Sequence, residues 1–321
     1  MMPSKNNYEL SKEEIDRVFK ERVLPSFKNK YKIQESKDLT AYFTAGVPGA
    51  GKSSIVKELK NKNPGIPVID MDNLRRFHPD YKDIMKKDPL NMANHTNEAA
   101  YQWAMALREE VIKSRSDFVF DSSLRTASNV EHYITSKDSG VTKDGYNAKV
   151  VMIAATKYEA LQGALKRYLQ QYEKDPSQAR YVDINFIEKS TETIKEAARK
   201  IEEMVNKSQI KEFQIRTREG VVIFDTSRGD KDAYKALDNY YDLSGKYWNK
   251  ERRDNLKKAW NQNIEKLDKT KIPKNDFDKI KEIGNNLKKE INNAIRKEFK
   301  NKQRDTNQPS KEKDKSKGFE R

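Results

Sequence analysis

The residues with the clearest chemical potential form one short segment. Residues 46–53 read Gly-Val-Pro-Gly-Ala-Gly-Lys-Ser, which is the complete pattern of a phosphate-binding loop. Glycines allow backbone N–H groups to turn toward phosphate oxygens, and the start of a following helix adds partial positive charge. Lys52 would reach the β- and γ-phosphates, and the Ser53 hydroxyl would bind Mg²⁺. The segment therefore predicts binding of a nucleoside triphosphate, with ATP and Mg²⁺ as cofactors.

The flanking sequence agrees with this pattern. The apolar run 39–45 is typical of a buried β-strand, and residues 53–59 are compatible with a helix. The alternative is an ordinary strand–turn–helix joint that matches by chance, and the agreement of pattern and context argues against it. The residues expected to bind the nucleotide are Gly46, Pro48, Gly49, Ala50, Gly51, Lys52, Ser53 and Ser54.

Composition narrows the class of protein. A chain of 321 residues can hold one α/β domain of about 200 residues plus extensions. Hydrophobic residues make up 35% and charged residues 36%, which indicates that part of the chain lies outside a large core. The chain has no cysteine, which excludes disulfides, thiolate metal sites and a cysteine nucleophile. The three histidines, at 78, 95 and 132, do not have the spacing of a metal-ligand cluster.

Targeting signals are not evident. Residues 1–12 are polar and lack the apolar segment of a signal peptide. No apolar run approaches the ~18 residues that a membrane span requires. We therefore expect no membrane span and a cytoplasmic location, while secretion without a cleavable signal stays open.

The net charge of +15 is concentrated near the C-terminus. Residues 246–321 contain 24 Lys and Arg against 13 Asp and Glu, a net +11; the remaining 41 and 37 leave only +4. The basicity therefore does not indicate that the main domain binds nucleic acid. A basic arm for RNA, a membrane or a partner is one interpretation of the C-terminal region. We favour a solvated helical extension.

Strand and helix patterns alternate through the middle of the chain. Strands are predicted at 39–45, 67–70, 118–120 and 148–155, and helices at 53–59, 92–114, 158–172 and 191–206. Residues 213–216 and 220–225 are predicted as the last strands, joined by a turn. This order predicts an α/β fold of the phosphate-loop NTPase type, with helices on both faces of a parallel sheet.

Four segments are expected along the chain. Residues 1–37 form an N-terminal helical segment that begins at a capping box, Ser11 to Glu14. Residues 38–229 form the phosphate-loop domain. Residues 230–300 form an extension of two amphipathic helices separated by Pro273, and residues 301–321 form a charged, disordered tail.

Three carboxylates are expected near the phosphate loop. Ligands of parallel sheets bind at the carboxyl ends of the strands, where Asp70, Asp72 and Asp121 are predicted to lie. An acceptor hydroxyl needs a base, for which Asp72 is the first candidate and Asp70 its rival, since strand alternation points both the same way. Asp72 could instead cap the following helix. Asp121 could hold Mg²⁺ through water or bind a substrate hydroxyl.

Arginines after the fourth strand indicate what happens to the γ-phosphate. Arg167 falls on a predicted helix and Arg180 on a predicted loop. Small-molecule and nucleotide kinases hold lid arginines that neutralise the transferring phosphoryl group, although either residue could simply lie at the surface. Arg125, four residues after Asp121, could contact a substrate phosphate. These residues favour a kinase over a switch GTPase or a motor ATPase.

The sequence resembles the zeta-toxin family, which phosphorylates UDP-N-acetylglucosamine. The resemblance covers about residues 38–228 and depends on the order and spacing of several short segments. These segments are 46–53, 68–72, 77–79, 97–99, 120–126, 167–168, 175–176, 179–180 and 218–221.

The resemblance implies roles for individual residues. Asp72, rather than Asp70, would activate the 3′-hydroxyl of the amino sugar. Arg167 and Arg180 would be the two lid arginines that stabilise the transferring phosphate, together with Lys52. The acceptor would be bound by Glu98, Asp121, Ser123 and Arg125. The partner implied is a small helical antitoxin that blocks the nucleotide site, and the N-terminal helix, residues 12–23, could occupy part of such a surface.

Two positions depart from the family pattern. The family usually has glutamate where this chain has Asp121, and threonine where it has Ser123. A side chain one methylene shorter reaches about 1.5 Å less, so contacts to the acceptor can shift. Members of the broader family also phosphorylate other small molecules, including dinucleotides.

Three hypotheses follow in order. The first is an ATP- and Mg²⁺-dependent kinase that phosphorylates the sugar of UDP-N-acetylglucosamine. The second is a kinase for another acceptor, such as a dinucleotide, an antibiotic or a nucleic-acid 5′ end, which the basic tail motivates. The third is a nucleotide-dependent switch without an acceptor site.

Overall fold

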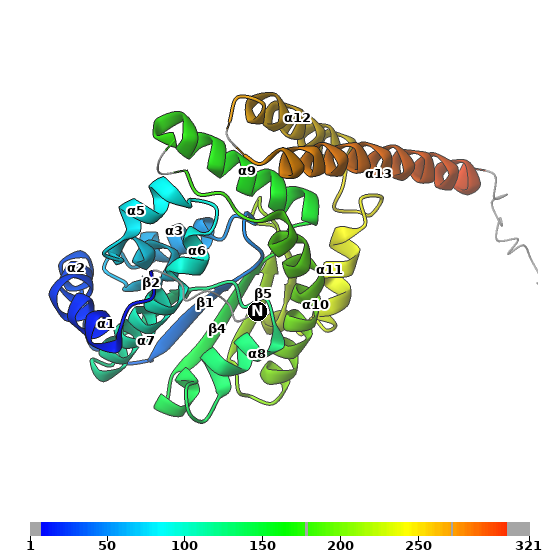
Figure 1. The fold of residues 1–321 in the computed structure, drawn as a ribbon. Coiled ribbons are helices and arrows are strands. Elements are labelled where there is room, and N and C mark those ends of the chain that lie inside the picture. The colour runs from blue at the N-terminus through cyan, green and yellow to red at the C-terminus, as the bar shows by residue number, and fades with distance from the viewer. Residues whose placement is uncertain (1–7, 177–178, 271, 307–321) are drawn as a thin grey trace, which may run out of the picture.

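A six-stranded sheet occupies the centre of the protein (Figure 1). The structure is a computed structural model that describes residues 8–176, 179–270 and 272–306. The strands lie in the order β2-β3-β1-β4-β5-β6, all parallel except the antiparallel pair β5 and β6. Their bounds are β1 Thr40–Ala45, β2 Val68–Asp70, β3 Phe118–Asp121, β4 Asn147–Ile153, β5 Glu212–Arg216 and β6 Val222–Asp225. The predicted α/β fold with a mostly parallel sheet is confirmed.

Helices lie on both sides of this sheet (Figure 1). Those before β4 are α1 Lys12–Val18, α2 Leu24–Lys30, α3 Ser53–Lys62, α4 Met71–Leu74, α5 Tyr81–Lys87, α6 Met92–His95, α7 Asn97–Lys113 and α8 Ala127–Val130. Those after β4 are α9 Lys157–Lys174, α10 Ile184–Asn206, α11 Ala233–Tyr241, α12 Lys250–Leu267 and α13 Lys274–Thr306. No helix in the described ranges is long and apolar enough to cross a membrane.

One hydrophobic core joins the sheet to both ends of the described chain. It contains Ile15 of α1, Phe43 of β1 and Trp260 of α12, each at most 4% exposed. Burying a side chain of this size contributes on the order of 2 kcal/mol. The C-terminal helices therefore share the core of the sheet domain.

The N-terminal helix begins at the predicted capping box. The Ser11 side chain accepts a hydrogen bond from the Glu14 N–H, and the Glu14 carboxylate accepts one from the Ser11 N–H. A π-helical turn, η1 Phe19–Val23, connects α1 directly to α2. The indole of Trp103 in α7 donates a hydrogen bond to the Ile15 carbonyl over 2.9 Å, which fixes α1 against α7.

The helix predicted over residues 92–114 is interrupted, which is a correction to the sequence analysis. Thr96 separates α6 from α7. In a continuous helix the carbonyl of Ala93 would accept from the N–H of Asn97. Here the buried Arg75 guanidinium donates to that carbonyl over 2.7 Å and to the Thr96 hydroxyl over 3.1 Å. Arg75, which belongs to another element, thus interrupts a helix that the local sequence favours.

Two other boundaries differ from the prediction. Helix α10 begins at Ile184 rather than near residue 191, because Asp183 caps it by accepting from the Asn185 N–H. Helix α13 continues to Thr306, so the disordered tail expected from residue 301 does not begin there. Residues 307–321, the remainder of that predicted tail, lie outside the described residues.

Candidate active site

The predicted phosphate loop connects β1 to α3. Its three glycines have positive φ angles, 135° at Gly46, 80° at Gly49 and 102° at Gly51, which side chains rarely tolerate. A Cβ at Gly49 would also lie 2.0 Å from the Ala160 carbonyl oxygen of α9. The loop therefore packs directly against the backbone of α9.

Lys52 stands at the N-terminus of α3, inside this loop. Its ammonium donates to the Gly46 carbonyl over 3.0 Å. Burial lowers the pKa of Lys52, while the negative charges of Asp121 and Asp72 act in the opposite direction. Among the described residues no carboxylate lies within ion-pairing distance of this ammonium. A half-buried cation without a direct counter-ion, at a helix N-terminus, is suited to an anion such as phosphate.

The other predicted loop residues surround this position. Ser53 is the first residue of α3 and is exposed, while Ala50 is fully buried. The Ser54 hydroxyl donates to the Gly51 carbonyl over 2.9 Å. Pro48 lies half-buried in the turn.

The sheet brings the ends of three strands next to the loop. Asp121 of β3 is in register with Thr44 of β1 on one side and with Asp70 of β2 on the other. The Thr44 hydroxyl donates to the Asp121 carboxylate over 2.5 Å. The N–H of Gly46 donates to the Ser123 carbonyl over 2.9 Å, so the chain after β3 is bonded to the first residue of the loop.

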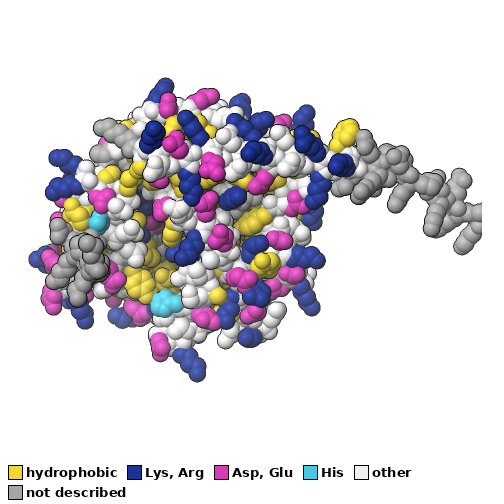
Figure 2. All heavy atoms as spheres, turned by 45° about the vertical axis from the view of Figure 1, so that its right-hand side comes forward, with side chains coloured by type: hydrophobic (Ala, Val, Ile, Leu, Met, Phe, Trp, Pro, Cys, Tyr) yellow, Lys and Arg dark blue, Asp and Glu magenta, His cyan; other side chains and the backbone are white. Residues whose placement is uncertain are grey.

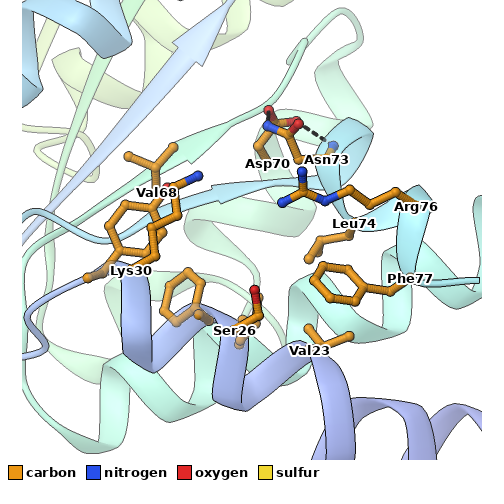
Figure 3. A pocket seen from close by; sticks show the side chains of 12 residues that line it. Val23, Ser26, Lys30, Val68, Asp70, Asn73, Leu74, Arg76 and Phe77 are labelled. Carbon is orange, nitrogen blue, oxygen red and sulfur yellow. Dashed lines mark hydrogen bonds between the residues drawn. The ribbon is translucent and has the colours of Figure 1, made fainter. Parts of the chain in front are cut away.

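Asp70, not Asp72, is the residue that caps the helix after β2. Its carboxylate accepts hydrogen bonds from the N–H groups of Asp72 and Asn73. It also accepts one from the side-chain amide of Asn73 (Figure 3). Asp70 also borders a cavity of about 40 Å³ beside α2. Burial and the neighbouring Asp121 and Asp72 raise the pKa of Asp70 to about 6.

Asp72 lies within α4, so the predicted strand alternation with Asp70 is wrong. The strand ends at Asp70, and the helical turn sends the Asp72 carboxylate toward two arginines. It accepts from Arg180 over 2.9 Å and from Arg75 over 3.2 Å, and it remains 47% exposed. Burial opposes ionisation of Asp72, but the charges of Arg180, Arg75 and Arg167 outweigh it and lower its pKa to about 2.

Arg75 connects Asp72 to the start of α7. Its guanidinium is buried and also donates to Asn97, the residue before Glu98, over 3.3 Å. The Glu98 carboxylate itself is exposed and accepts from the Gln102 amide over 2.7 Å. The predicted acceptor residue Glu98 therefore lies one residue from a group bonded to Arg75, which in turn binds Asp72.

The two predicted lid arginines differ in their contacts. Arg180 forms the ion pair with Asp72, whereas Arg167 lies half-buried on α9 and interacts with Asp72 only through its charge. The Nε atoms of both arginines are buried without a hydrogen-bond partner among the described residues. Arg125 is not brought to this group: its guanidinium stacks on the ring of Phe186, 4.5 Å from the centroid.

Sequence reasoning missed two residues that organise the site. Arg75 is three residues after Asp72, a spacing that would have suggested a helical ion pair had the helix been recognised. Arg218, in the turn between β5 and β6, donates to the Gly49 carbonyl over 3.0 Å and to the Glu159 carbonyl over 3.1 Å. Arg218 falls in segment 218–221 of the family resemblance, which marked its position but implied no role for it.

Comparison with known proteins agrees with this arrangement of a phosphate-loop fold. The profile of the family described as Zeta toxin matches residues 26–229. The chain is 24% identical to Toxin zeta of Enterococcus hirae over 142 residues, which are 44% of this chain and 48% of that protein. It is also 24% identical to Toxin PezT of Streptococcus pneumoniae over 206 residues, 64% of this chain and 78% of that protein.

A solved structure shares the fold. It comes from a characterisation of the PezAT chromosomal toxin–antitoxin system of Streptococcus pneumoniae, with a TM-score of 0.64 and 21% identity over 80% of this chain and 99% of that chain. Because the family profile covers well over half of the sequence, the chain belongs to the zeta toxin family. It spans about half the length of the first curated relatives that it matches.

Proposed function

We propose that this protein is an ATP- and Mg²⁺-dependent kinase that phosphorylates the 3′-hydroxyl of the amino sugar in UDP-N-acetylglucosamine. The bond between the γ-phosphorus and the β–γ bridging oxygen breaks, and a bond from that phosphorus to the sugar oxygen forms. The hydroxyl proton passes to Asp72, and ADP leaves. Lys52, Arg167 and Arg180 neutralise charge on the transferred phosphoryl group.

The observation that carries this proposal is the ion pair between Asp72 and Arg180 beside the phosphate loop. A base must lie within reach of the acceptor hydroxyl, and a cation must lie near the phosphoryl oxygens. The Asp72 carboxylate and the Arg180 guanidinium, 2.9 Å apart, supply one group of each kind. Membership in the zeta toxin family supports the same assignment.

The ion pair also bears on when Asp72 can act as a base. With its pKa near 2, the carboxylate is fully ionised but binds a proton weakly. The γ-phosphate competes for Arg180 when ATP is bound. Loss of that guanidinium raises the pKa of Asp72 and strengthens it as a base at the time of transfer.

The residues of the loop fit ATP and Mg²⁺. Backbone N–H groups of a glycine cradle match the triphosphate, as does the Lys52 ammonium, which has no carboxylate within ion-pairing distance in the described ranges. Ser53 would contribute its hydroxyl to Mg²⁺. No cluster of three His, Asp or Glu side chains that could hold a metal occurs in the described ranges, which suits an ion held mainly by phosphates and water.

The residues assigned to the acceptor are those at the positions that the family pattern implies. Glu98 lies in the first turn of α7, Asp121 is the last residue of β3 and Ser123 follows it, in the order that the family pattern implies. Arg125 would have to leave its stack on Phe186 to contact a phosphate of the acceptor. The shorter Asp121 is already bonded to Thr44, which holds it toward β1.

The test is ADP release from Mg²⁺-ATP with and without UDP-N-acetylglucosamine, for the wild type and for Asp72→Asn. We expect strong stimulation by the sugar nucleotide in the wild type and loss of stimulation in the variant. Acceptor-independent hydrolysis that ignores the substitution would instead indicate a nucleotide switch. ADP release stimulated only by a dinucleotide or an RNA 5′ end would mean that the protein is a kinase with an acceptor other than UDP-N-acetylglucosamine.

A small helical antitoxin is the proposed protein partner, acting in the cytoplasm. The proposal rests on family membership, since the similar PezT structure was described as part of a toxin–antitoxin system. The N-terminal elements η1 and α2 border the cavity beside Asp70 (Figure 3). Co-purification of the chain with the product of a neighbouring short reading frame, and inhibition of ADP release by it, would test this partner.

A further inference from the structure

The helices after residue 229 contact the phosphate-transfer site through α9. In Figure 1, α9 lies between the sheet domain and the C-terminal helices α12 and α13. The Trp260 indole of α12 donates to the Tyr158 carbonyl over 3.2 Å, and the Asn263 amide donates to the Gln162 carbonyl over 3.0 Å. Both α12 side chains are buried. The extension is therefore hydrogen-bonded to the backbone of α9 and does not contact its side chains alone.

The opposite face of α9 carries the contact with the phosphate loop. A Cβ at Gly163 would lie 2.3 Å from the Gly49 carbonyl oxygen, so loop and helix meet backbone to backbone. Residues three, four or seven apart share a helix face, so Ala160, Gly163 and Arg167 lie together. Residues two apart are about 200° apart around the helix, so Tyr158 and Gln162 face away from Ala160.

A buried carboxylate on α9, that of Glu159, connects α9 to the C-terminal helices and to the turn that carries Arg218. Glu159 of α9 is 4% exposed and accepts from the Tyr240 hydroxyl of α11 and from Arg252 of α12, each over 3.0 Å. Arg252 also pairs with Glu219 over 2.9 Å, next to the Arg218 that binds the phosphate loop. Burying a carboxylate is costly unless it is fully paired, so this group constrains all of its partners.

The extension also reaches the helix after Arg180. Lys279 of α13 pairs with Glu188 of α10 over 2.7 Å and donates to Asn185 over 2.7 Å. The two C-terminal helices are held to each other by a bidentate pair of Arg253 and Glu298, at 2.7 and 2.8 Å. The pair of helices α12 and α13 thus contacts α9, which carries Arg167, and α10, which follows Arg180.

We propose that the C-terminal extension, residues 230–300, is a positioning element for phosphate transfer. It presses the first half of α9 against the phosphate loop, and so sets the positions of Gly49 and Arg167 relative to the nucleotide. The inference rests on the proposed kinase function, and its key residues, Arg252 and Asn263, act through α9 rather than on the substrate. Figure 2 agrees with a structural rather than a polyanion-binding role, because acidic side chains are interspersed with the basic ones on the face it shows.

The first experiment is Arg252→Met, with readouts that need no acceptor. We expect amide exchange in the first turns of α9 to rise about tenfold, because a local opening becomes easier. We expect the affinity for Mg²⁺-ADP, measured by calorimetry, to fall about threefold to tenfold because the loop loses its support. Arg252→Lys should restore part of both effects.

A second, milder variant keeps the proposal testable if Arg252→Met does not fold. Asn263→Leu removes only the hydrogen bond to the Gln162 carbonyl and should change both readouts in the same direction by a smaller factor. Lys266→Gln is the local control, since it removes only an exposed ion pair with Glu173 on the same two helices. Val111→Ala in α7 is the stability control, because it creates a core cavity in another element.

The kinetic readout separates positioning from stability. With the acceptor that the wild type phosphorylates, we expect Arg252→Met to lower kcat about tenfold and to leave the acceptor KM within about twofold. Unchanged exchange and ADP affinity in both α12 variants would overturn the proposal. So would equal effects in Val111→Ala at a matched melting temperature. Absence of kinase activity with UDP-N-acetylglucosamine in the wild type would count against the proposed function only.

Discussion

The phosphate loop and the carboxylate–arginine group beside it are built in contrasting ways. The loop is eight consecutive residues whose conformation follows from its glycines and from the strand and helix at its ends. The group around Asp72 takes Arg75 from the next turn of chain, Arg167 from α9 and Arg180 from the segment before α10. The loop can be recognised from its own sequence, whereas the second group exists only once distant elements have packed.

This difference has an energetic side. The charge of Lys52 lacks a direct counter-ion among the described residues, so the loop keeps its capacity for an anion. Asp72 and Arg180 instead neutralise each other in the free protein. Lys52 can therefore bind an anion without breaking an ion pair. Arg180 must first give up its ion pair with Asp72 before it can bind the phosphate.

The largest effect is expected from Lys52→Ala. Removing the cation that neutralises the transferring phosphate should lower kcat/KM about 10³-fold or more. The measurement is ADP release at saturating acceptor, with Lys57→Ala as the control, since Lys57 is exposed on the same helix. A loss smaller than about tenfold would mean that the loop does not carry the catalysis.

The next comparison is between Asp72→Asn and Asp70→Asn. Removing the general base should cost about 10²- to 10⁴-fold in kcat, while removal of the capping charge at Asp70 should cost about tenfold or less. Both substitutions keep the size and shape of the side chain and replace one carboxylate oxygen by an amide nitrogen, so they form a matched pair. The reverse order of effects would transfer the role of base to Asp70.

Gly49→Ala tests the contact between the loop and α9 through stability. The new Cβ would lie 2.0 Å from the Ala160 carbonyl oxygen, and the backbone φ is already +80°. We expect the free energy of unfolding to fall by about 3 kcal/mol. Gly220→Ala, with φ +87° and no neighbour within 4 Å, should cost only about 1 kcal/mol from backbone strain. Urea unfolding measures both free energies. Equal losses for the two variants would mean that the close contact between Gly49 and α9 adds nothing to the cost of the substitution.

The smallest expected effect is a pH dependence caused by Asp70. Its pKa is about 6 in the folded protein, above the ordinary value of 3.8. Between these two pH values the folded protein holds a proton on Asp70 that the unfolded chain has released. Stability from this group is present below about pH 4 and is lost as pH rises through about 6. Asp72 acts in the opposite sense, because its lowered pKa contributes stability above about pH 4 that is lost as pH falls toward 2.

Asp70→Asn should remove the loss between pH 4 and 6. We expect the difference in unfolding free energy between wild type and variant to change by on the order of 1 kcal/mol between pH 4.5 and 7. Urea unfolding at the two values measures it. A difference that does not change with pH would mean that Asp70 has an ordinary pKa.

Much of the fold was predictable because its signals are local. Short apolar runs that end at Asp or Gly predicted β1 to β3, a longer apolar run predicted β4, and the capping box at Ser11 predicted the start of α1. The errors occurred where a distant side chain decided the outcome. Arg75 interrupts the helix over residues 92–114, and the end of β2 at Asp70 places Asp72 on a helix instead of a strand.

The sequence by itself determined the phosphate loop, the order of strands and helices, and the identity of the residues at the strand ends. These features depend on glycine conformations, apolar periodicity and capping, which involve neighbours within a few residues. Only the tertiary structure decided that Asp72 pairs with Arg180 and that α12 is hydrogen-bonded to the backbone of α9. Such ion pairs and backbone contacts join residues up to 169 positions apart, as between Arg218 and Gly49, and packing alone brings them together.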